Sequence, residues 1–466
     1  MDSRPVQSTP ELSTSLTAPL LQAEKQIIAH QSGIESWFRT QWRNTPAPFY
    51  TSVDLRNSGY KIAPVDTNLF PAGFNNLNPD FEAICIQALQ LAADRMGKKI
   101  DRILLIPENH TRNMFYLENV RILQALIAKA GFDVVIGSLI PGLTEPQYIV
   151  LDSGSNLLLH PLVRNGDILS VSGFVPDMVL LNNDLSGGRP EILENLHQPV
   201  VPSLSLGWSS RLKSTHFRHY KEIAQEFSEL IGIDPWFIDP MFRNCGEIDF
   251  MKKDSNSCLE NHVNALLAAI QKKYTEYGVE HKPYVVVKAD AGTYGMGVMM
   301  VHSSVELLDM NRKERTRMST TKEGQKVSKV IVQEGVYTNE TSGADKTVAE
   351  SVVYMIDKNV VGGFYRIHPK KGVNENLNSP GMQFEPLAFH DCRVSPDKAL
   401  SPDALPNRFY TYGVIARLAN LAAARETLNL EGHGIPCLIV LGGLDSRLFG
   451  GPVLPNILNG IIITNS

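Results

Sequence analysis

The sequence predicts an N-terminal α/β domain with a largely parallel sheet, followed by a region of α+β character. Two observations support this division. Apolar strand patterns alternate with helical patterns in the first half, as in β-α-β units. Strand patterns dominate the second half, where hairpins and one long helix replace the alternation. The length of 466 residues allows two or three domains that each bury a core.

The elements of the first half follow in a regular order. Helices are predicted where apolar residues recur every three or four positions, and strands where short apolar runs follow a glycine or polar residue. In chain order these are a helix over 81–97, a strand over 102–108, a helix over 114–131, strands over 133–139 and 177–184, and a helix over 216–232.

The second half begins with a helix and then becomes rich in strands. Its predicted elements are a helix over 258–278, strands over 284–290 and 329–336, two strands joined around residues 357–359, and a helix over 408–430. Between them, residues 312–326 form a charged run that is expected to be a solvated segment. The predicted divisions are a polar, partly disordered lead-in over 1–36, an α/β substrate-binding domain over 37–205, a nucleotide-binding catalytic region over 206–432, and an apolar glycine-rich tail over 433–466.

Composition excludes several classes of function. A formal net charge of -5 provides no broad basic surface for nucleic acid. No apolar run reaches the length of a membrane span, and the N-terminus lacks the pattern of a secretory signal. Five scattered cysteines without C-x-x-C spacing predict reduced thiols rather than a disulfide framework or a zinc site. A cytoplasmic protein is therefore expected, and oligomerisation is left open.

A glycine-rich loop is the first candidate for chemistry. In "KADAGTYGMGVMMV", Lys288 closes an apolar strand, and Gly292, Gly295 and Gly297 follow it. Glycines let backbone N–H groups approach an anion, and a lysine adds a point charge for phosphate. The alternative is a tight turn with no ligand, because the loop matches neither a Walker A nor a Rossmann pattern.

Features further along the chain favour the phosphate interpretation. Gln333, Glu334 and Val336 close an apolar strand whose backbone could bind a nucleotide base. Glu350 and Asn376 have oxygens that suit Mg²⁺, and Arg366 suits a transferring phosphoryl group.

This order of features resembles the ATP-grasp superfamily. The segment "YRIHPKKGVNENLNSPG" resembles the arginine-to-asparagine segment of glutathione synthetase-type ligases. The segment "WSSRLKSTHFRHYKEIAQEFSELIGIDP" resembles the one that carries their first nucleotide-contacting lysine, which would be Lys213, with Lys221 as the alternative. The sequence therefore predicts an ATP-grasp domain in the second half.

Three further segments make the resemblance more specific. These are "SVDLRNSGYKIAPVDTNLFPAGFNNL", "LLIPENHTRN" and "LLNNDLSGG", which resemble the proteobacterial glutamate–cysteine ligase family that is built on ATP-grasp. The resemblance covers roughly Trp37 to Leu430. It implies that ATP phosphorylates the γ-carboxylate of glutamate and that the cysteine amine attacks the acyl phosphate, giving γ-glutamylcysteine, ADP and phosphate. The implied cofactors are ATP and Mg²⁺, with Mn²⁺ as an alternative metal.

The resemblance also implies roles for individual residues. Lys288 and Arg366 would be catalytic, and Lys213, the three loop glycines and the 333–336 segment would bind ATP. An amino acid zwitterion needs a cation for its carboxylate and an acceptor for its ammonium group. The candidates for this substrate binding are Asp54, Arg56, Asn68, Asn75 and Asn76. The competing interpretation is that these side chains only cap local turns.

The metal ligands are the weakest point of the resemblance. Many ATP-grasp enzymes carry an E-x-N pattern on a late strand, and this pattern is absent after Leu430. Glu350 and Asn376 are therefore predicted to bind the metal, with Glu385 or Asp445 as alternatives. The rival functions are another ATP-grasp ligase with a different acid and amine, and a nucleotide-binding sensor or scaffold without catalysis.

Overall fold

The structure is a computed structural model, and it describes residues 18–110, 112–251, 257–292, 297–319, 327–343, 345–387 and 408–430. Within these ranges the strands form three larger sheets and one two-stranded ribbon. None of the helices in the described ranges is long and apolar enough to cross a bilayer.

The central sheet is antiparallel and joins strands from distant parts of the chain. Its order is β18-β17-β16-β1-β2, and β15 also pairs with β16. The strands are β1 (Tyr50–Asn57), β2 (Ile62–Asn68), β15 (Glu340–Ser342), β16 (Thr347–Ile356), β17 (Asn359–Ile367) and β18 (Gln383–Pro386). Asp54 lies opposite Val352, and Glu350 lies opposite Arg366. The predicted division at residue 205 therefore does not separate the sheets, because β1 and β2 pair with strands of the second half.

The second sheet confirms the prediction of a largely parallel arrangement. Its order is β10-β9-β3-β4-β6-β5, in which only β5 runs antiparallel to its neighbour. The strands are β3 (Arg102–Pro107), β4 (Asp133–Ser138), β5 (Gln147–Val150), β6 (Asn156–Pro161), β9 (Met178–Asn182) and β10 (Val200–Val201). Helices α3 (Glu82–Asp94) and α4 (Met114–Lys129) bury apolar side chains in the same hydrophobic cluster as this sheet. The ribbon consists of β7 (Val163–Asn165) and β8 (Ile168–Ser170).

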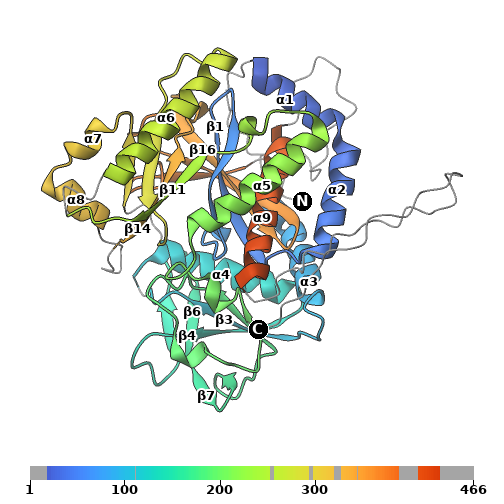
Figure 1. Cartoon of the computed structure of the whole chain (residues 1–466). Helices are drawn as coiled ribbons and strands as arrows, with labels where there is room; N and C mark the ends of the chain where they lie inside the picture. Colours follow the sequence, from blue (N-terminus) through green and yellow to red (C-terminus); the bar gives the residue numbers. More distant parts are fainter. Residues whose placement is uncertain are drawn as a thin grey trace, which may run out of the picture.

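The third sheet is antiparallel, with the order β11-β14-β12-β13. The strands are β11 (Phe242–Glu247), β12 (Val285–Ala289), β13 (Val298–Val301) and β14 (Lys329–Glu334). Helix α6 (Ser257–Tyr277) packs on it, and α7 (Val305–Leu308) and α8 (Arg312–Ser319) follow β13. Figure 1 shows β11 and β14 at the upper left and β3 and β4 at the bottom, with β1 and β16 of the central sheet above them. The charged run is helical where it is described, up to Ser319.

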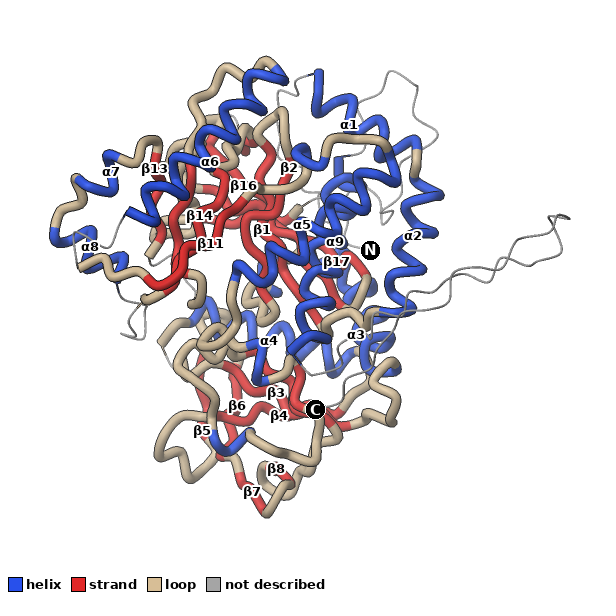
Figure 2. The backbone as a smooth tube through the Cα atoms, viewed as in Figure 1, coloured by secondary structure: helices blue, strands red, loops and turns tan. Residues whose placement is uncertain are grey.

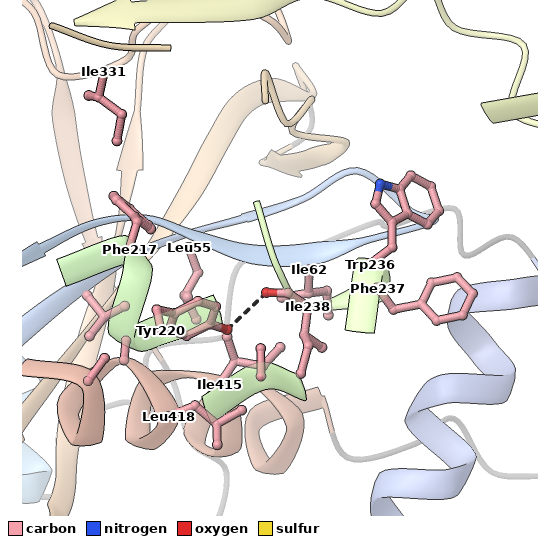
Figure 3. Close-up of a cluster of buried hydrophobic side chains, with 14 of the residues drawn as sticks. Leu55, Ile62, Phe217, Tyr220, Trp236, Phe237, Ile238, Ile331, Ile415 and Leu418 are labelled. Carbon is pink, nitrogen blue, oxygen red and sulfur yellow. Dashed lines mark hydrogen bonds between the residues drawn. The ribbon is translucent and has the colours of Figure 1, made fainter. Parts of the chain in front are cut away.

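Two long helices cover the central sheet. They are α5 (Lys213–Ile231) and α9 (Arg408–Leu430), which pack against each other, and α9 also contacts β1 and β2. Helix α9 is buried over most of its length, and its buried residues include the polar Asn420 and the charged Arg417 and Glu426. Figure 3 shows Ile415 and Leu418 of α9 near Tyr220 of α5, whose hydroxyl donates to the carbonyl of Ile238 at 2.9 Å.

The segment predicted as a polar, partly disordered lead-in is helical where the structure describes it. Residues 18–36 form α1 (Ala18–Ala29) and the start of α2 (Gln31–Asn44). Leu20, Ile27 and Ile34 are buried in the core that includes α9, and Figure 2 shows both helices beside α5 and α9. Their apolar residues recur at helical spacing, which is typical of a helix. The many polar residues around them made this pattern hard to recognise in the sequence. Residues 1–17 and 433–466 lie outside the described ranges.

Five short 3-10 helices complete the described elements. They are η1 (Phe74–Asn76), η2 (Pro79–Phe81), η3 (Glu191–Leu193), η4 (Leu204–Leu206) and η5 (Pro235–Phe237). The first two follow β2 and end the segment that was predicted to bind substrate.

Candidate active site

A cavity of about 870 Å³, open to solvent, lies between the central sheet and the third sheet. Its walls come from strands of both sheets, from the start of α5 and from the loop after β17. Most of the residues predicted for ATP, metal and catalysis line it: Lys213, Lys288, Gly292, Gln333, Glu334, Val336, Glu350, Arg366 and Asn376, together with Asp54 and Arg56. Residues as far apart in sequence as Asp54 and Asn376 thus share one cavity.

A second cavity of about 1110 Å³ lies on the other side of Asp54 and Arg366. Asn68 and Asn76 line it, as do residues from the carboxyl ends of strands in the parallel sheet, where such sheets collect ligands. Both cavities are lined by Asp54, Asp66, Arg366 and Asn378. The two spaces therefore meet at two carboxylates, one guanidinium and one amide.

Four residues at this meeting point form what we call the arginine cluster: Asp54, Arg56, Glu350 and Arg366. Arg366 Nη1 donates to Asp54 Oδ2 at 2.8 Å and to Glu350 Oε1 at 2.5 Å. Arg56 Nε donates to Glu350 Oε2 at 2.9 Å. The antiparallel register of β1, β16 and β17 brings these side chains to one face of the central sheet.

The two carboxyl groups of the arginine cluster have pKa values shifted in opposite directions. Burial alone would raise the pKa of Glu350, but Arg56 and Arg366 outweigh it and hold that pKa below its usual range. Burial raises the pKa of Asp54, and the neighbouring charge of Glu350 adds to the effect, against the attraction of Arg366. The Nε of Arg366 is buried and has no hydrogen-bond partner among the described residues. A buried guanidinium donor without a partner at a cavity wall is suited to an anionic ligand.

A second group, the lysine cluster, consists of Asp66, Lys213 and Lys288. Lys213 Nζ lies 3.3 Å from Asp66 Oδ1 and 3.6 Å from the centre of the Trp208 ring. Lys288 Nζ donates to the carbonyl of Val65 at 2.8 Å. Lys221, the alternative to Lys213, is exposed on α5 and lines neither cavity.

The lysine cluster carries excess positive charge. Burial lowers the pKa of Lys288 to about 8, and the positive charge of Lys213 contributes to this shift. Burial would raise the pKa of Asp66, but the charges of Lys213, Lys288 and Arg211 lower it to about 2. Two lysines that share one carboxylate can accept further negative charge, such as a phosphate group.

Two buried contacts hold the lysine cluster in place. Asp290, directly after β12, accepts from the backbone N–H and the hydroxyl of Ser214, both at 2.7 Å, and so fixes the start of α5. Arg211 forms a bidentate pair with Glu426 of α9, at 3.0 and 2.9 Å, and also donates to the carbonyl of Thr67 at 2.7 Å. This pair ties α9 to the residues beside Lys213 and Asp66.

The segment 333–336 forms one wall of the first cavity, but not with the carboxylate of Glu334. That carboxylate is buried, 2.5 Å from Lys61 Nζ, and it also accepts from Trp236 Nε1 at 3.1 Å. The Nε2 of Gln333 is buried without a partner among the described residues. Apolar side chains complete the walls, namely Val65, Val286, Ala289, Val298, Met300 and Val336.

The comparisons with known proteins agree with this geometry. The family model "GshA: Glutamate-cysteine ligase" matches residues 24–427. The chain belongs to the glutamate–cysteine ligase family. It is 53% identical to a protein of Methylobacillus flagellatus KT whose crystal structure is provisionally assigned as a gamma-glutamylcysteine synthetase, with 90% of this chain and 99% of that chain covered and a TM-score of 0.84.

Two other solved structures are more distant. One is a glutathione synthetase-like effector from Globodera pallida, at 11% identity, a TM-score of 0.32 and coverage of 79% of this chain and 81% of that chain. The other is a D-alanyl-alanine synthetase A from Vibrio cholerae, at 10% identity, a TM-score of 0.29 and coverage of 72% and 82%. A comparison with curated proteins gave no match.

The residues predicted to bind the substrate of this glutamate–cysteine ligase family enzyme do not all line the same cavity. Asp54 and Arg56 belong to the arginine cluster. Asn76 lines the second cavity, and its Nδ2 is buried without a partner in the described part of the chain. Asn68 also lines it, but its side chain bonds to the backbone N and O of Phe70, as the turn-capping interpretation requires. Asn75 lines neither cavity.

The glycine loop is described only at its two ends. Gly292 lines the first cavity with φ 94°, and its N–H donates to the carbonyl of Trp208 at 3.1 Å. Gly297 has φ 67°, and its carbonyl accepts from Ala289 at 3.3 Å. Both backbone conformations favour glycine. Gly295 lies outside the described residues.

The predicted metal ligands are already engaged. Both oxygens of Glu350 accept from arginines, and Asn376 Oδ1 accepts from the backbone N–H of Asn378 at 2.9 Å. Glu385 bonds to Ser342 at 2.5 Å and lines neither cavity, and Asp445 lies outside the described residues. Asp54 and Asp66 fit a hard cation better, because each uses one oxygen for a protein cation and both line the two cavities.

Sequence reasoning missed several residues of the site. Asp66 was within the family-like segment but was not singled out. Glu108 and His110 were not singled out either, and both line the second cavity. Four residues were considered as ligands because they follow predicted strands: Asp184 lines the second cavity, whereas Asn109, Arg112 and Asn183 line neither cavity. The signal was available in part, since Glu108 directly follows a strand of the parallel sheet.

Proposed function

We propose that this enzyme joins the γ-carboxylate of L-glutamate to the amine of L-cysteine through an acyl phosphate, with ATP as the phosphoryl donor. The observation that carries the proposal is the shared wall of the two cavities at Asp54, Asp66, Arg366 and Asn378. ATP in the first cavity would direct its γ-phosphate at this wall, and glutamate in the second would present its side chain from the other side. Phosphoryl transfer then requires mainly positioning and charge neutralisation.

The lysine cluster would hold the phosphates. Lys213 and Lys288 supply two cations near one carboxylate, and Gly292 brings bare backbone to the same wall. The apolar walls and the partnerless Nε2 of Gln333 suit adenine, which presents ring-nitrogen acceptors and flat faces. Glu334 would contribute its backbone rather than its carboxylate.

The arginine cluster would stabilise the acyl phosphate. Asp54 and Glu350 fix the guanidinium of Arg366, so that no reorganisation is needed when charge develops on the phosphoryl group. Its Nε would supply the donor. Arg56 is oriented by Glu350 and by the carbonyl of Val336, so it would act by positioning Glu350 rather than by binding glutamate.

Mg²⁺, with Mn²⁺ as an alternative, would be held by Asp54 and Asp66 rather than by Glu350 and Asn376. When bound, such a cation neutralises the oxygens of the β- and γ-phosphates. The two aspartates stand at the shared wall, where the lysines hold Asp66 ionised.

The second cavity would bind the amino acids. Asn68 and Asn76 offer amide groups, and Glu108, Asp184 and His110 offer acceptors for an ammonium group or for the proton that the cysteine amine must lose. Glu108 Oε2 and His110 Nε2 lie 2.6 Å apart, so a proton can be shared between them.

The order of functional elements supports an ATP-grasp architecture for the second half. A lysine ends β12, a glycine loop leads to β13, and β14 ends at the 333–336 segment, all in one antiparallel sheet beside the arginine-bearing sheet. The first cavity lies between these two sheets. A nucleotide bound there would be held between two layers of the protein.

A product assay with ATP, glutamate and a panel of amines tests the proposal. We expect ADP and phosphate, glutamate-dependent phosphate release, and a sharp rise with cysteine compared with serine, alanine and 2-aminobutyrate. AMP and pyrophosphate as stoichiometric products would exclude the acyl-phosphate reaction. Faster turnover with another amine would leave the reaction type intact and change the substrate, and tight ATP binding without any turnover would indicate a sensor or scaffold.

A further inference from the structure

Two cysteines and a histidine lie together where helix α6 packs on the third sheet. Cys245 is on β11, and Cys258 and His262 are on α6. Their ligand atoms all lie within 4.8 Å of one another, and the two sulfurs are 3.7 Å apart. None of the three lines either cavity. From this geometry we propose that Cys245, Cys258 and His262 form a binding site for a soft or borderline divalent metal ion such as Zn²⁺.

The spacing of the three residues suits such a site. Cys258 and His262 are four positions apart on a helix, so they share one face, and the sheet presents Cys245 opposite that face. With Zn–S bonds of about 2.3 Å in a tetrahedral arrangement, two sulfurs on one zinc lie about 3.8 Å apart. The observed sulfur separation of 3.7 Å matches this value and is far longer than a disulfide bond of about 2.0 Å.

Ligand chemistry selects the class of metal. Two thiolates and one imidazole are the donors that Zn²⁺ prefers, whereas Mg²⁺ and Ca²⁺ require oxygen ligands. Cys245 is buried, His262 is half-buried and Cys258 is exposed, so an ion can enter from the side of α6. Three protein ligands leave the fourth position to water or another small ligand.

The metal would replace thiol protons. Burial raises the pKa of Cys245 to about 12, and the adjacent Cys258 adds to the shift, so this sulfur keeps its proton in the metal-free protein. Binding therefore releases protons and becomes tighter as the pH rises.

The ion would tie α6 to the sheet that carries the 333–336 segment. Cys245 lies opposite Val330 in the β11–β14 pair, and Phe242 lies opposite Gln333. A bond from β11 to α6 would thus stabilise one wall of the first cavity without entering it. The sequence alone did not predict the site because its ligands come from two elements and lack C-x-x-C spacing.

The experiment is Zn²⁺ titration of the full-length protein by calorimetry, after removal of metal and in the presence of a phosphine reductant without ATP or Mg²⁺. We expect one tight site, which Cys258→Ser and His262→Ala each weaken about 100-fold, because each ligand supplies a comparable share of the binding. Cys258 is exposed and His262 is half-buried, so these variants should fold. Cys245→Ser should act likewise. Cys85→Ser is the matched control, since Cys85 is a buried cysteine of another core cluster, and its isotherm should equal that of the wild type.

Co²⁺ absorption gives a second readout, because two thiolate ligands produce an intense charge-transfer band that should disappear in the Cys258→Ser variant. Identical Zn²⁺ isotherms for the wild type and for Cys258→Ser would overturn the proposal, and so would an unaffected His262→Ala variant. If mild oxidation also yields a product lighter by two hydrogens, with Cys245 linked to Cys258, the pair is a redox couple instead of a metal site.

Discussion

The arginine cluster and the lysine cluster line the same cavity but are built differently. In the arginine cluster each carboxylate is held by guanidinium groups at 2.5 to 2.9 Å, on three adjacent strands. In the lysine cluster the only carboxylate contact is the 3.3 Å pair of Lys213 and Asp66, and Lys288 bonds to a backbone carbonyl instead. One cluster is geometrically fixed, and the other holds surplus positive charge.

This difference indicates that the arginine cluster contributes a fixed orientation and the lysine cluster contributes charge. A guanidinium held by two carboxylates has one defined orientation. This suits a transition state that needs hydrogen-bond donors at fixed positions. An ammonium group is a flexible point charge, which suits phosphates that arrive with their own charge and leave with the product. The arginine cluster should therefore be sensitive to shape, and the lysine cluster to charge.

The largest effect is expected for Arg366→Gln. It removes the charge and the donor that are proposed to face the transferring phosphoryl group, so kcat/KM for γ-glutamylcysteine formation should fall about 1000-fold or more. Arg243→Gln, at an exposed arginine of β11, is the control and should leave the kinetics unchanged. A folded Arg366→Gln enzyme, judged by its thermal transition, that stays within tenfold of the wild type would refute the role of Arg366.

Lys288→Met should have the next largest effect. It removes the charge that is proposed to contact phosphate but keeps a similar side-chain length, so it should cost about 2–4 kcal/mol, or roughly 30- to 1000-fold in kcat/KM. Lys282→Met, at an exposed lysine before β12, is the matched control. Unchanged kinetics for Lys288→Met would make the loop a turn without a nucleotide role.

Substitutions that keep the positive charge should distinguish the two clusters by the size of their effect on kcat/KM. Arg366→Lys keeps the charge but loses the planar fork, and we expect about a 100-fold loss of kcat/KM. Lys288→Arg keeps the charge at a wall with room beside it, and we expect a loss below about tenfold. Steady-state kinetics on both variants checks the comparison, which fails if the two losses are equal or reversed.

The smallest predicted effect is on the pH dependence of nucleotide affinity. The pKa of Lys288 in the free protein is about 8, below the usual lysine value, and phosphate binding should raise it again. As the pH rises through 8, Lys288 loses its proton in the free protein while it is still protonated in the ATP complex. ATP affinity should therefore fall, by about tenfold between pH 7 and pH 9. Calorimetry with a non-hydrolysable ATP analogue measures this slope. The Lys288→Met variant should show a flatter profile, and an equal slope in both proteins would assign the titration to another group.

The sequence predicted elements and single residues well where a local signal existed. The helix over 408–430, the strand that ends at Lys288 and the strands around 357–359 carry strong apolar patterns, and the structure confirms them. Asp54 and Arg56 could be named as candidates because an amino acid needs an acceptor and a cation, and Arg366 because an arginine suits a transferring phosphoryl group. Their mutual contacts could not be predicted, since they depend on β1 pairing with β16 across about 300 residues.

Other parts of the site had no local signal. Asp66 resembles any turn-flanking aspartate until two lysines from other elements surround it. Glu334 was expected at the nucleotide, but Lys61, a residue 273 positions away in sequence, holds its carboxylate inside the core. Glu350 was a sound candidate for a metal by residue type, and only the two arginines beside it show that its oxygens are occupied.

The Arg211–Glu426 pair also has a consequence for the order in which the protein matures during synthesis. The two residues are 215 positions apart, and the bond crosses from the start of α5 to the end of α9. Until Glu426 has been synthesised and has left the ribosome, Arg211 cannot be buried together with its counter-charge. Burying Arg211 without that carboxylate would be strongly destabilising. The long-range pairing of β1 with β16 likewise waits for the second half. The phosphate-binding face is thus completed last, so translation that stops before residue 426 should release a chain that cannot bind ATP.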